Sequence, residues 1–446
     1  MPSSLSSSHH EDELADALVA LSVDHIASHQ ASPDTLLTAA TAVREGPLFY
    51  LRNRDRSMEL LGIGGVLSFK AQSLKHFQAS FEWLMPALRC HPHRHALFLL
   101  GGTSFDGERP GTPWEAFGGV HFIIPRCLLL RKESSVDVFL IGDREGPIIP
   151  ADPASHPNSG ASWEGIEPNS DEWNEVISVA LDQISAGAFE KVVLARRAHA
   201  KLDAPIHPIH VLSRLLSSPQ RVAGFAFAPS TQINRCFFGA TPELLFTLKD
   251  EILESEAVAG TLQAQSPQKW AISPDSSLMI PSQKEREEHE YVVSAIVNRL
   301  QSISDTVEAE TEPYLSPLHD LYHLVTPIRA RLKKAISPLD IIALLHPTPA
   351  VCGSPQEKAR AFIRAHEPFE RGWYAGTIGF FNAYHSEFSV GLRSALLDHQ
   401  RLSAYVGAGI VRGSTAAKEW EELDLKQRRL EDSIARTTPE ERTIER

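Results

Sequence analysis

Short apolar runs that are typical of β-strands recur along the chain, and helices do not separate them in a regular order. Residues 47–149 are mostly strand-like, and the later sequence mixes strands with expected helices at 282–301, 357–366 and 415–432. Grouped strands with peripheral helices favour an α+β fold over a doubly wound one. The clearest expected strands are 60–65, 96–102, 121–125, 136–141, 192–196, 222–227, 235–238, 377–381, 388–392 and 402–406.

The length and composition allow one large core or several smaller ones. A chain of 446 residues with 42% hydrophobic residues suggests two or three domains, although one large assembly also fits. Residues 1–12 are polar and are expected to form a flexible tail. The stretch 151–170 is rich in Pro, Ser, Asn and Gly, so we expect it to link a first half, 13–150, to a second half.

The charge and the chain's N-terminal sequence limit the expected partners and compartment. A formal net charge of -13 argues against nucleic acid and against anionic membrane surfaces. We find no apolar run of membrane-spanning length, and the first residues lack the apolar core of a signal peptide. The four scattered cysteines fit buried thiols in a reducing compartment. We therefore expect a cytoplasmic monomer that binds a small molecule, with a plastid location left open.

Lys191 stands at the start of an apolar, strand-like run that follows an amphipathic helix expected at 173–184. A lysine that enters a buried strand must extend its amine to solvent or lose its proton more easily, because burial disfavours the charged form. A neutral lysine can act as a general base. The alternative is an edge-strand lysine that points to solvent.

Two of the expected helices each carry a pair of carboxylates on one face. Glu285 and Glu288 lie three residues apart in the first helix, and Glu419 and Glu422 have the same spacing in the second. Two such helices can hold Mg²⁺ between them, since magnesium is bound through one or two protein carboxylates and keeps several waters. The alternatives are two solvated charged faces and a helix-capping role for Glu285.

Four further sites in the sequence have settings that fit a substrate pocket. Glu243 follows a glycine-bearing turn, where partial burial would favour the neutral carboxyl of a general acid. Arg393 lies in a strand-like run, where a buried guanidinium needs a carboxylate partner. Gly407 and Gly409 follow a strand and would let backbone N–H groups approach an anion. A surface turn is the alternative for Glu243, and a satisfied core position is the alternative for His323.

Taken together and in this order, these segments resemble the chorismate-utilising enzyme family, which contains isochorismate, salicylate, anthranilate and aminodeoxychorismate synthases. The resemblance extends from about residue 173 to residue 430. The matching stretches are 191–194, 240–245, 259–261, 282–289, 323–326, 346–353, 371–376 and 407–426.

The resemblance implies a fold and a place for the site. The fold would be two packed antiparallel sheets flanked by helices, pseudo-duplicated, in one chorismate-binding unit over 13–446 with a variable half, 13–150, and a catalytic half, 171–432. The site would lie in the cleft between the ends of the sheets. Lysine at position 191 is typical of members that add water, whereas members that add ammonia usually carry glutamine. The segment 346–353 is similar to that of isochorismate synthases.

The implied reaction is the reversible, Mg²⁺-dependent conversion of chorismate to isochorismate. Lys191 would take a proton from the water that attacks ring carbon 2, and Glu243 would protonate the departing 4-hydroxyl. Glu288 and Glu422 would hold Mg²⁺, with Glu285 and Glu419 acting through water. The substrate would be contacted by Gly260, Thr261, His323, Ala350, Tyr374, Arg393, Gly407, Gly409 and Lys426.

Two other functions are compatible with this resemblance. A salicylate synthase would form isochorismate and then eliminate pyruvate, and such members often carry threonine near the position of Ala350. A catalytically inactive chorismate-binding protein is disfavoured, because the base, the acid and all four carboxylates are present.

Overall fold

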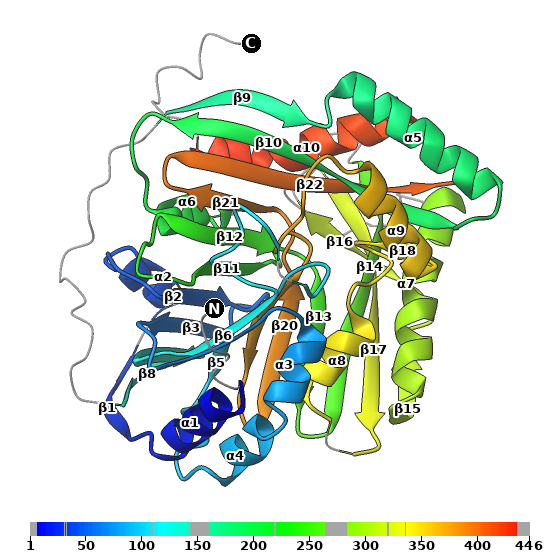
Figure 1. Ribbon diagram of the computed structural model, residues 1–446. Helices are drawn as coiled ribbons and strands as arrows, with labels where there is room; N and C mark the ends of the chain where they lie inside the picture. Colours follow the sequence, from blue (N-terminus) through cyan, green and yellow to red (C-terminus); the bar gives the residue numbers. More distant parts are fainter. Residues whose placement is uncertain are drawn as a thin grey trace, which may run out of the picture.

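The computed structural model describes residues 7–434 except 31, 33, 109, 143–159, 218–219, 264–282, 319–320 and 335. Its strands form one sheet of twelve strands and one of ten, and helices surround them (Figure 1). Neighbouring strands in both sheets pair antiparallel, for example β10 with β22 and β14 with β17. The predicted α+β fold with two antiparallel sheets is therefore confirmed.

The first sheet has the order β1 (Val23–Gln30), β8 (Ser135–Ile141), β7 (Cys127–Lys132), β3 (Met58–Ile63), β2 (Leu48–Arg52), β11 (Ala223–Ala228), β12 (Arg235–Thr241), β21 (Ser394–Asp398), β22 (Arg401–Val411), β10 (Lys191–Leu202) and β18 (Gly353–Ser354), and β9 (Ala161–Glu167) also pairs with β10. The second has the order β15 (Ser304–Ala309), β17 (Leu321–Leu332), β14 (Ile252–Gln263), β13 (Leu244–Lys249), β20 (His385–Val390), β19 (Thr377–Phe381), β5 (Leu99–Thr103), β6 (Val120–Ile124) and β4 (Leu67–Ala71), and β16 (Tyr314–Leu318) pairs with β17.

The helices are α1 (Ser7–Val19), α2 (Thr35–Ala40), α3 (Leu74–Ser80), α4 (Leu84–Cys90), α5 (Ser170–Ser185), α6 (Pro208–Leu215), α7 (Gln283–Gln301), α8 (Pro338–Leu345), α9 (Gln356–His366) and α10 (Ala416–Ile434). The helices expected at 173–184, 282–301, 357–366 and 415–432 correspond to α5, α7, α9 and α10. None of the described helices combines the length and the apolarity needed to cross a membrane.

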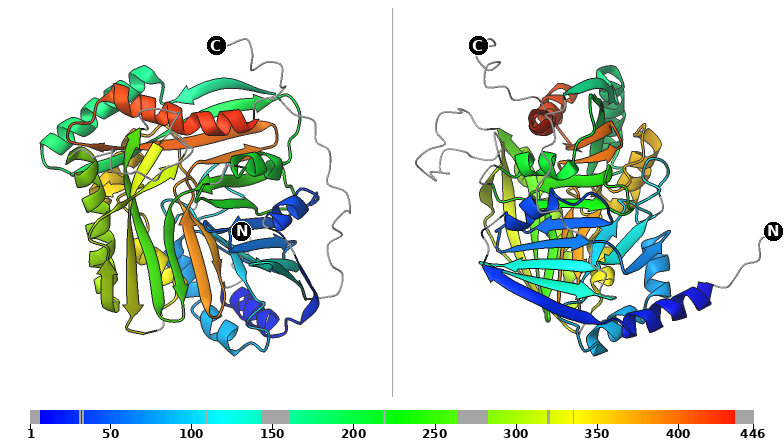
Figure 2. Two further views of the ribbon diagram at one scale, coloured as in Figure 1. Left: turned by 180° about the vertical axis from the view of Figure 1, so that it is seen from behind. Right: turned by 90° about the vertical axis from the view of Figure 1, so that its left-hand side faces the viewer.

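Both sheets take strands from both halves of the sequence. The first half supplies β1, β2, β3, β7 and β8 to one sheet and β4, β5 and β6 to the other. Each sheet also has a long strand pair with a long helix against it, since α10 packs on β22 and α7 packs on β14. Figure 2 shows these two helices along different sides of the molecule. This matched arrangement supports the expected pseudo-duplication.

Two segments expected to be irregular contain regular elements. Helix α1 begins at Ser7, inside the expected tail 1–12, of which residues 1–6 lie outside the described residues. Strand β9 lies inside the expected linker 151–170, of which residues 151–159 also lie outside the described residues. Strand β9 pairs with β10 but is largely exposed, so its sequence lacks the apolar alternation that marks a half-buried strand.

Helix α5 leads directly into β10 and fixes where Lys191 enters the sheet. Its first turn is closed by a capping box, in which the Asn169 side chain accepts from the Glu172 backbone and the Glu172 carboxylate accepts from the Asn169 backbone. The residues buried on its inner face are Trp173, Ile177, Ala180 and Ile184. This helical spacing packs one stripe of α5 on the core and sets the direction of the chain into β10.

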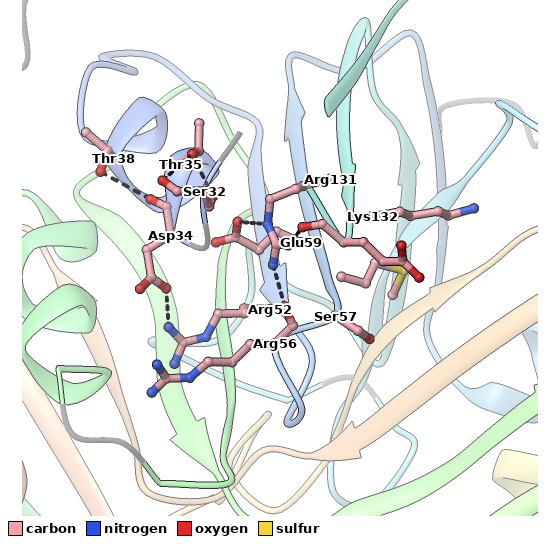
Figure 3. A network of polar contacts seen from close by, with 12 residues as sticks. Ser32, Asp34, Thr35, Thr38, Arg52, Arg56, Ser57, Glu59, Arg131 and Lys132 are labelled. Atoms are coloured by element: carbon pink, nitrogen blue, oxygen red, sulfur yellow. Dashed lines mark hydrogen bonds and ion pairs between the residues drawn. The ribbon is translucent and has the colours of Figure 1, made fainter. Parts of the chain in front are cut away.

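A buried polar network joins three neighbouring strands of the first sheet, and Figure 3 shows its Arg131–Glu59 contact. On β7, the Arg131 Nε donates to Glu59 Oε2 of β3 at 2.6 Å, and the Tyr50 hydroxyl of β2 donates to Glu59 Oε1 at 2.8 Å. Both charged side chains are almost completely buried. A buried ion pair of this kind supports the folded state only while both partners are present, because a buried charge without a partner raises the free energy of the folded protein.

We expect the Glu59→Ala variant to lose about 3–5 kcal/mol of unfolding free energy, because it leaves Arg131 charged and without its carboxylate. Replacing both partners, as Glu59→Leu with Arg131→Met, should cost less than the single change. Urea unfolding followed by circular dichroism measures both.

The matched control for this prediction is Glu254→Ala, which removes the carboxylate of an exposed pair with Arg329 whose atoms are 3.8 Å apart. That change should cost less than about 1 kcal/mol. Equal losses in Glu59→Ala and Glu254→Ala would contradict the assigned role of the buried network.

Candidate active site

Two of the turns that carry the chain from one sheet to the other lie where the sheets meet, and backbone hydrogen bonds hold each of them to a strand end nearby. Glu243 lies between β12 of the first sheet and β13 of the second, and Arg393 lies between β20 of the second sheet and β21 of the first. The expected position of Arg393 inside a strand is therefore wrong, and its backbone has a positive φ of 48°. The Val390 N–H donates to the Glu243 carbonyl at 3.0 Å, and the Ala240 N–H donates to the Arg393 carbonyl at 3.3 Å. An acidic and a basic side chain are thus held where the sheets meet.

A cavity lies at this junction, and most of the predicted site residues line it. They are Glu243, Gly260, Glu288, His323, Ala350, Tyr374, Arg393, Gly407, Gly409, Glu422 and Lys426. The cavity has walls from both sheets and from α7 and α10. The residues predicted from the sequence therefore line one pocket, although they are spread over more than a third of the chain.

Lys191 is fully buried and is not among the residues that line this cavity, but its amine reaches Glu288, which does line it. Its Nζ lies 2.9 Å from Glu288 Oε1, which makes an ion pair but not a well-aligned hydrogen bond. The predicted solvent-exposed alternative for Lys191 is therefore wrong. Because residues two apart share a face of a strand, Lys191 lies on the same face of β10 as Val193, which lines the cavity.

The expected position of Gly407 and Gly409 after a strand is wrong, because β22 continues through both of them to Val411. The two glycines leave room for the polar groups around the cavity. A Cβ at Gly409 would lie 2.5 Å from Glu288 Oε1 and 3.2 Å from Lys191 Cε. A Cβ at Gly407 would lie 2.8 Å from the Tyr374 hydroxyl. In the strand register Gly409 is opposite Val193 and Gly407 is opposite Ala195. Their role here is steric, because any side chain would displace the Lys191–Glu288 pair or Tyr374.

Glu243 is buried, and burial is the main cause that raises its pKa from 4.5 to about 7. The Thr348 hydroxyl, which donates to Glu243 Oε1 at 3.2 Å, and the positive charges of Lys191 and Arg54 partly offset this rise. Near neutral pH a large fraction of Glu243 therefore carries its proton. The alternative of an exposed surface-turn glutamate is wrong.

Arg393 and Lys426 give one wall of the cavity a positive charge, and His323 lies beside them. Arg393 Nη2 donates to His323 Nε2 at 3.0 Å, and burial followed by the charges of Arg393 and Lys426 lowers the pKa of His323 well below 6.5. The imidazole is therefore neutral and accepts from the guanidinium. Burial also lowers the pKa of Arg393, to about 10, so this side chain stays charged at neutral pH.

The four predicted metal-binding carboxylates do not all face the cavity. Glu288 and Glu422 line it, and Glu422 Oε1 lies 2.6 Å from Lys426 Nζ. Glu285 is half-buried and Glu419 is buried, and neither is among the lining residues. Within the part of the chain that the structure describes, no three Asp, Glu, His or Cys side chains gather closely enough to hold a metal by themselves.

Thr261 is the remaining predicted contact. Its backbone lies in β14 opposite His323 of β17, and its side chain lies outside the described residues. The preceding Gly260 has a positive φ of 77° and lines the cavity, and a Cβ there would lie 2.9 Å from the Glu285 carbonyl. Glycine at 260 therefore allows α7 to pack closely against β14.

Sequence reasoning missed three residues that support the site. Thr348 bonds to Glu243, and Arg54 donates from Nη1 to the Pro242 carbonyl at 2.7 Å. His289 contacts the Ala259 carbonyl at 3.2 Å through Nδ1 and the Thr326 hydroxyl at 2.7 Å through Nε2, which braces α7 beside Glu288. Thr348 and His289 were within the matching stretches, but Arg54 is in the variable half and carries no local signal.

Comparisons with known proteins agree with this geometry. A family model described as chorismate binding enzyme matches residues 10–141 and 150–435. Isochorismate synthase MenF of Escherichia coli (strain K12) is 31% identical over 396 residues, which cover 85% of this chain and 86% of the relative. Isochorismate synthase 2, chloroplastic, of Arabidopsis thaliana is 36% identical over 355 residues, which cover 79% of this chain and 59% of the relative.

A solved structure extends the similarity to the whole fold. The structure of MenF, the menaquinone-specific isochorismate synthase from Escherichia coli, matches with a TM-score of 0.78 at 26% identity and covers 97% of this chain and 100% of that chain. The family model and the relatives span both halves of the sequence. The chain belongs to the family of chorismate-binding enzymes.

The buried Glu243 carboxyl gives folding stability a pH dependence that Glu243→Gln should remove. The folded-state pKa is about 7 and the ordinary value is 4.5, so the stability from the neutral carboxyl is complete below pH 4.5 and is lost as the pH rises to 7. This loss amounts to about 3 kcal/mol. Urea unfolding of both proteins across this range should show the variant gaining on the wild type with rising pH. Parallel curves would contradict the assigned protonation of Glu243.

Proposed function

We propose that this chain is an isochorismate synthase, which interconverts chorismate and isochorismate. The observation that carries the proposal is a buried lysine, Lys191, beside the cavity that is lined by a buried carboxyl, Glu243, whose raised pKa of about 7 leaves it about half protonated near neutral pH. The reaction needs a base for water and an acid for the departing hydroxyl at the same time. The relatives from Escherichia coli and Arabidopsis thaliana are both named as isochorismate synthases.

Lys191 and Glu243 divide the two proton transfers between them. Lys191, as a neutral amine, takes a proton from the water that attacks ring carbon 2. The two ring double bonds shift, the bond from ring carbon 4 to its hydroxyl breaks, and Glu243 gives that hydroxyl its proton. One water is consumed and one is released, so the product is an isomer of the substrate. In the reverse direction the protonated Lys191 and the ionised Glu243 exchange roles.

The positive wall would bind the carboxylates of chorismate. The formal net charge of the chain is -13, so attraction of an anionic substrate must come from local groups. Arg393 is charged, half-buried and bonded to a neutral imidazole, which leaves it suited to a carboxylate. Burial raises the pKa of Tyr374, so its hydroxyl keeps its proton and can donate.

Glu288 and Glu422 would hold a Mg²⁺ ion, with Glu285 and Glu419 acting through water. The fit rests on two observations: both carboxylates line the same cavity, and each lies within 3 Å of a lysine amine, that of Lys191 or Lys426. Magnesium commonly takes only one or two protein carboxylates, so the absence of a third close ligand among the described residues is compatible with it. A bound Mg²⁺ would neutralise the ring carboxylate of the substrate.

The product should be isochorismate rather than salicylate. Pyruvate elimination requires the ring hydrogen to be aimed at the enolpyruvyl group, and the small Ala350 in the cavity wall does little to enforce that pose. The purified protein should therefore bring chorismate and isochorismate to equilibrium. Chromatography identifies the acids, and a lactate-dehydrogenase-coupled assay measures pyruvate. Stoichiometric pyruvate with salicylate would assign the chain to the salicylate synthases, and no turnover would make it a binding protein.

Loss of either proton-transfer group should reduce the turnover rate while the protein stays folded. Lys191→Ala removes the base and Glu243→Gln removes the acid, and each should lower kcat on the order of 10²- to 10⁴-fold. Lys201→Ala is the matched control, because Lys201 lies on the same strand and is exposed. Steady-state rates with circular dichroism of each variant test this. A Lys191→Ala enzyme with the wild-type rate would refute the mechanism.

Removal of divalent metal should stop turnover. EDTA should abolish activity and Mg²⁺ should restore it, and Glu288→Gln and Glu422→Gln should each lose most of it. Calorimetry should also show Mg²⁺ binding that each of these changes weakens. Glu421→Gln, an exposed neighbour on α10, should behave as the wild type. Full activity of the two cavity variants without added metal would exclude the metal assignment.

A further inference from the structure

One edge of β10 has a gap in its strand pairing close to Lys191. β22 pairs with β10 on one side along almost its whole length. On the other side β18 pairs at Lys191 and Val192, and β9 pairs only from Arg197 onward. Among the described strands, none covers this edge in between. The backbone groups there are buried, so they need hydrogen-bond partners from elsewhere.

Two side chains occupy the gap. Arg371 Nη2 donates to the Val193 carbonyl at 2.7 Å, and the Ala195 N–H donates to Glu367 Oε1 at 2.8 Å. The two side chains are only 3% and 4% exposed, and Arg371 Nε donates to Glu367 Oε2 at 2.8 Å. A guanidinium and a carboxylate thus replace the donor and the acceptor that a neighbouring strand would supply.

The same guanidinium reaches two other walls of the cavity. Arg371 Nη1 donates to the Val351 carbonyl at 2.8 Å, next to Ala350. The Arg371 guanidinium also lies over the Tyr374 ring, with its Cζ 6.0 Å from the ring centroid. Val351, Ala350 and Tyr374 all line the cavity. One side chain therefore ties the strand of the base to the loop before β18 and to the turn of Tyr374.

We propose that the Arg371–Glu367 pair positions Lys191 against the rest of the active site. The inference rests on the proposed function, in which Lys191 activates water. Neither side chain is assigned contact with substrate, so both are positioning residues. Misplacement of a reacting group by about 1 Å can cost on the order of 10²-fold in rate. Lysine in place of Arg371 cannot reproduce the contacts, because an ammonium lacks the planar fork that serves three acceptors.

The test compares Glu367→Gln and Arg371→Lys with the control Arg364→Gln. Arg364 lies on α9 close to Glu367, is half-exposed and pairs with Asp106, away from the gap. Rates of isochorismate formation are measured well below each melting temperature and divided by the folded fraction. We expect the two gap variants to lose about tenfold or more in kcat and the control to match the wild type.

Amide hydrogen exchange provides a readout that does not depend on catalysis. In the gap variants, exchange should rise in 192–196 and stay unchanged in 197–202, which β9 covers. Wild-type kcat per folded molecule in either variant would overturn the proposal. So would exchange that rises evenly along β10, or loss of the fold in both variants, since each would show only a general stabilising role. If the wild type itself does not turn over chorismate, the proposed function fails, and the exchange pattern still decides what the pair holds.

Discussion

The chain crosses between its two sheets through turns that are hydrogen-bonded to their neighbours on both sides, and these crossings determine where the chemistry takes place. The backbone of the Glu243 turn is bonded to Val390, and that of the Arg393 turn to Ala240. These main-chain bonds fix the positions from which the two side chains start. Strands β10 and β22 then bring Lys191 and the two glycines to the same junction, and helices α7 and α10 bring Glu288 and Glu422. A rigid framework of this kind is what precise acid–base geometry requires.

Burial and compensation of charge explain how an acidic protein holds an anion. Three basic side chains near the junction each have a carboxylate partner: Lys191 has Glu288, Lys426 has Glu422, and Arg371 has Glu367. Arg393 differs, because its described hydrogen bond is to the neutral imidazole of His323. A buried guanidinium with a neutral partner retains its attraction for a ligand carboxylate. Burial also raises the pKa of Glu243 to about 7, so about half of this carboxyl is protonated near pH 7.

The sequence predicted the residues whose chemistry is unusual for their local setting. Lys191 in a strand, the paired carboxylates of two helices, and glycines after a strand all carry local signals, and the ordered motifs connect them. The α+β class followed from the grouping of strands. The edge strand β9 was missed because its exposed face removes the apolar pattern. Arg371 belongs to the matching stretch 371–376 and Glu367 lies just before it, but their role depends on a gap between β18 and β9, which only the assembled sheet reveals.

Carboxylates at regular helical spacing were the least decisive signal. The spacing places Glu285 with Glu288 and Glu419 with Glu422, yet only Glu288 and Glu422 reach the cavity wall. Spacing defines a shared face of a helix but not how far that face lies from a pocket. That distance is set by packing, here by Gly260 under α7 and by the inner face of α10 against β22.

The central claim is that Lys191 activates a solvent water, and isotope labelling tests it most directly. The purified enzyme is incubated with chorismate in ¹⁸O-labelled water, and the first isochorismate formed is analysed by mass spectrometry. Attack by water predicts that the hydroxyl on ring carbon 2 of this product carries the heavy oxygen. Isochorismate with an unlabelled hydroxyl would show that the group moved within the substrate, and a water-activating role for Lys191 would be contradicted.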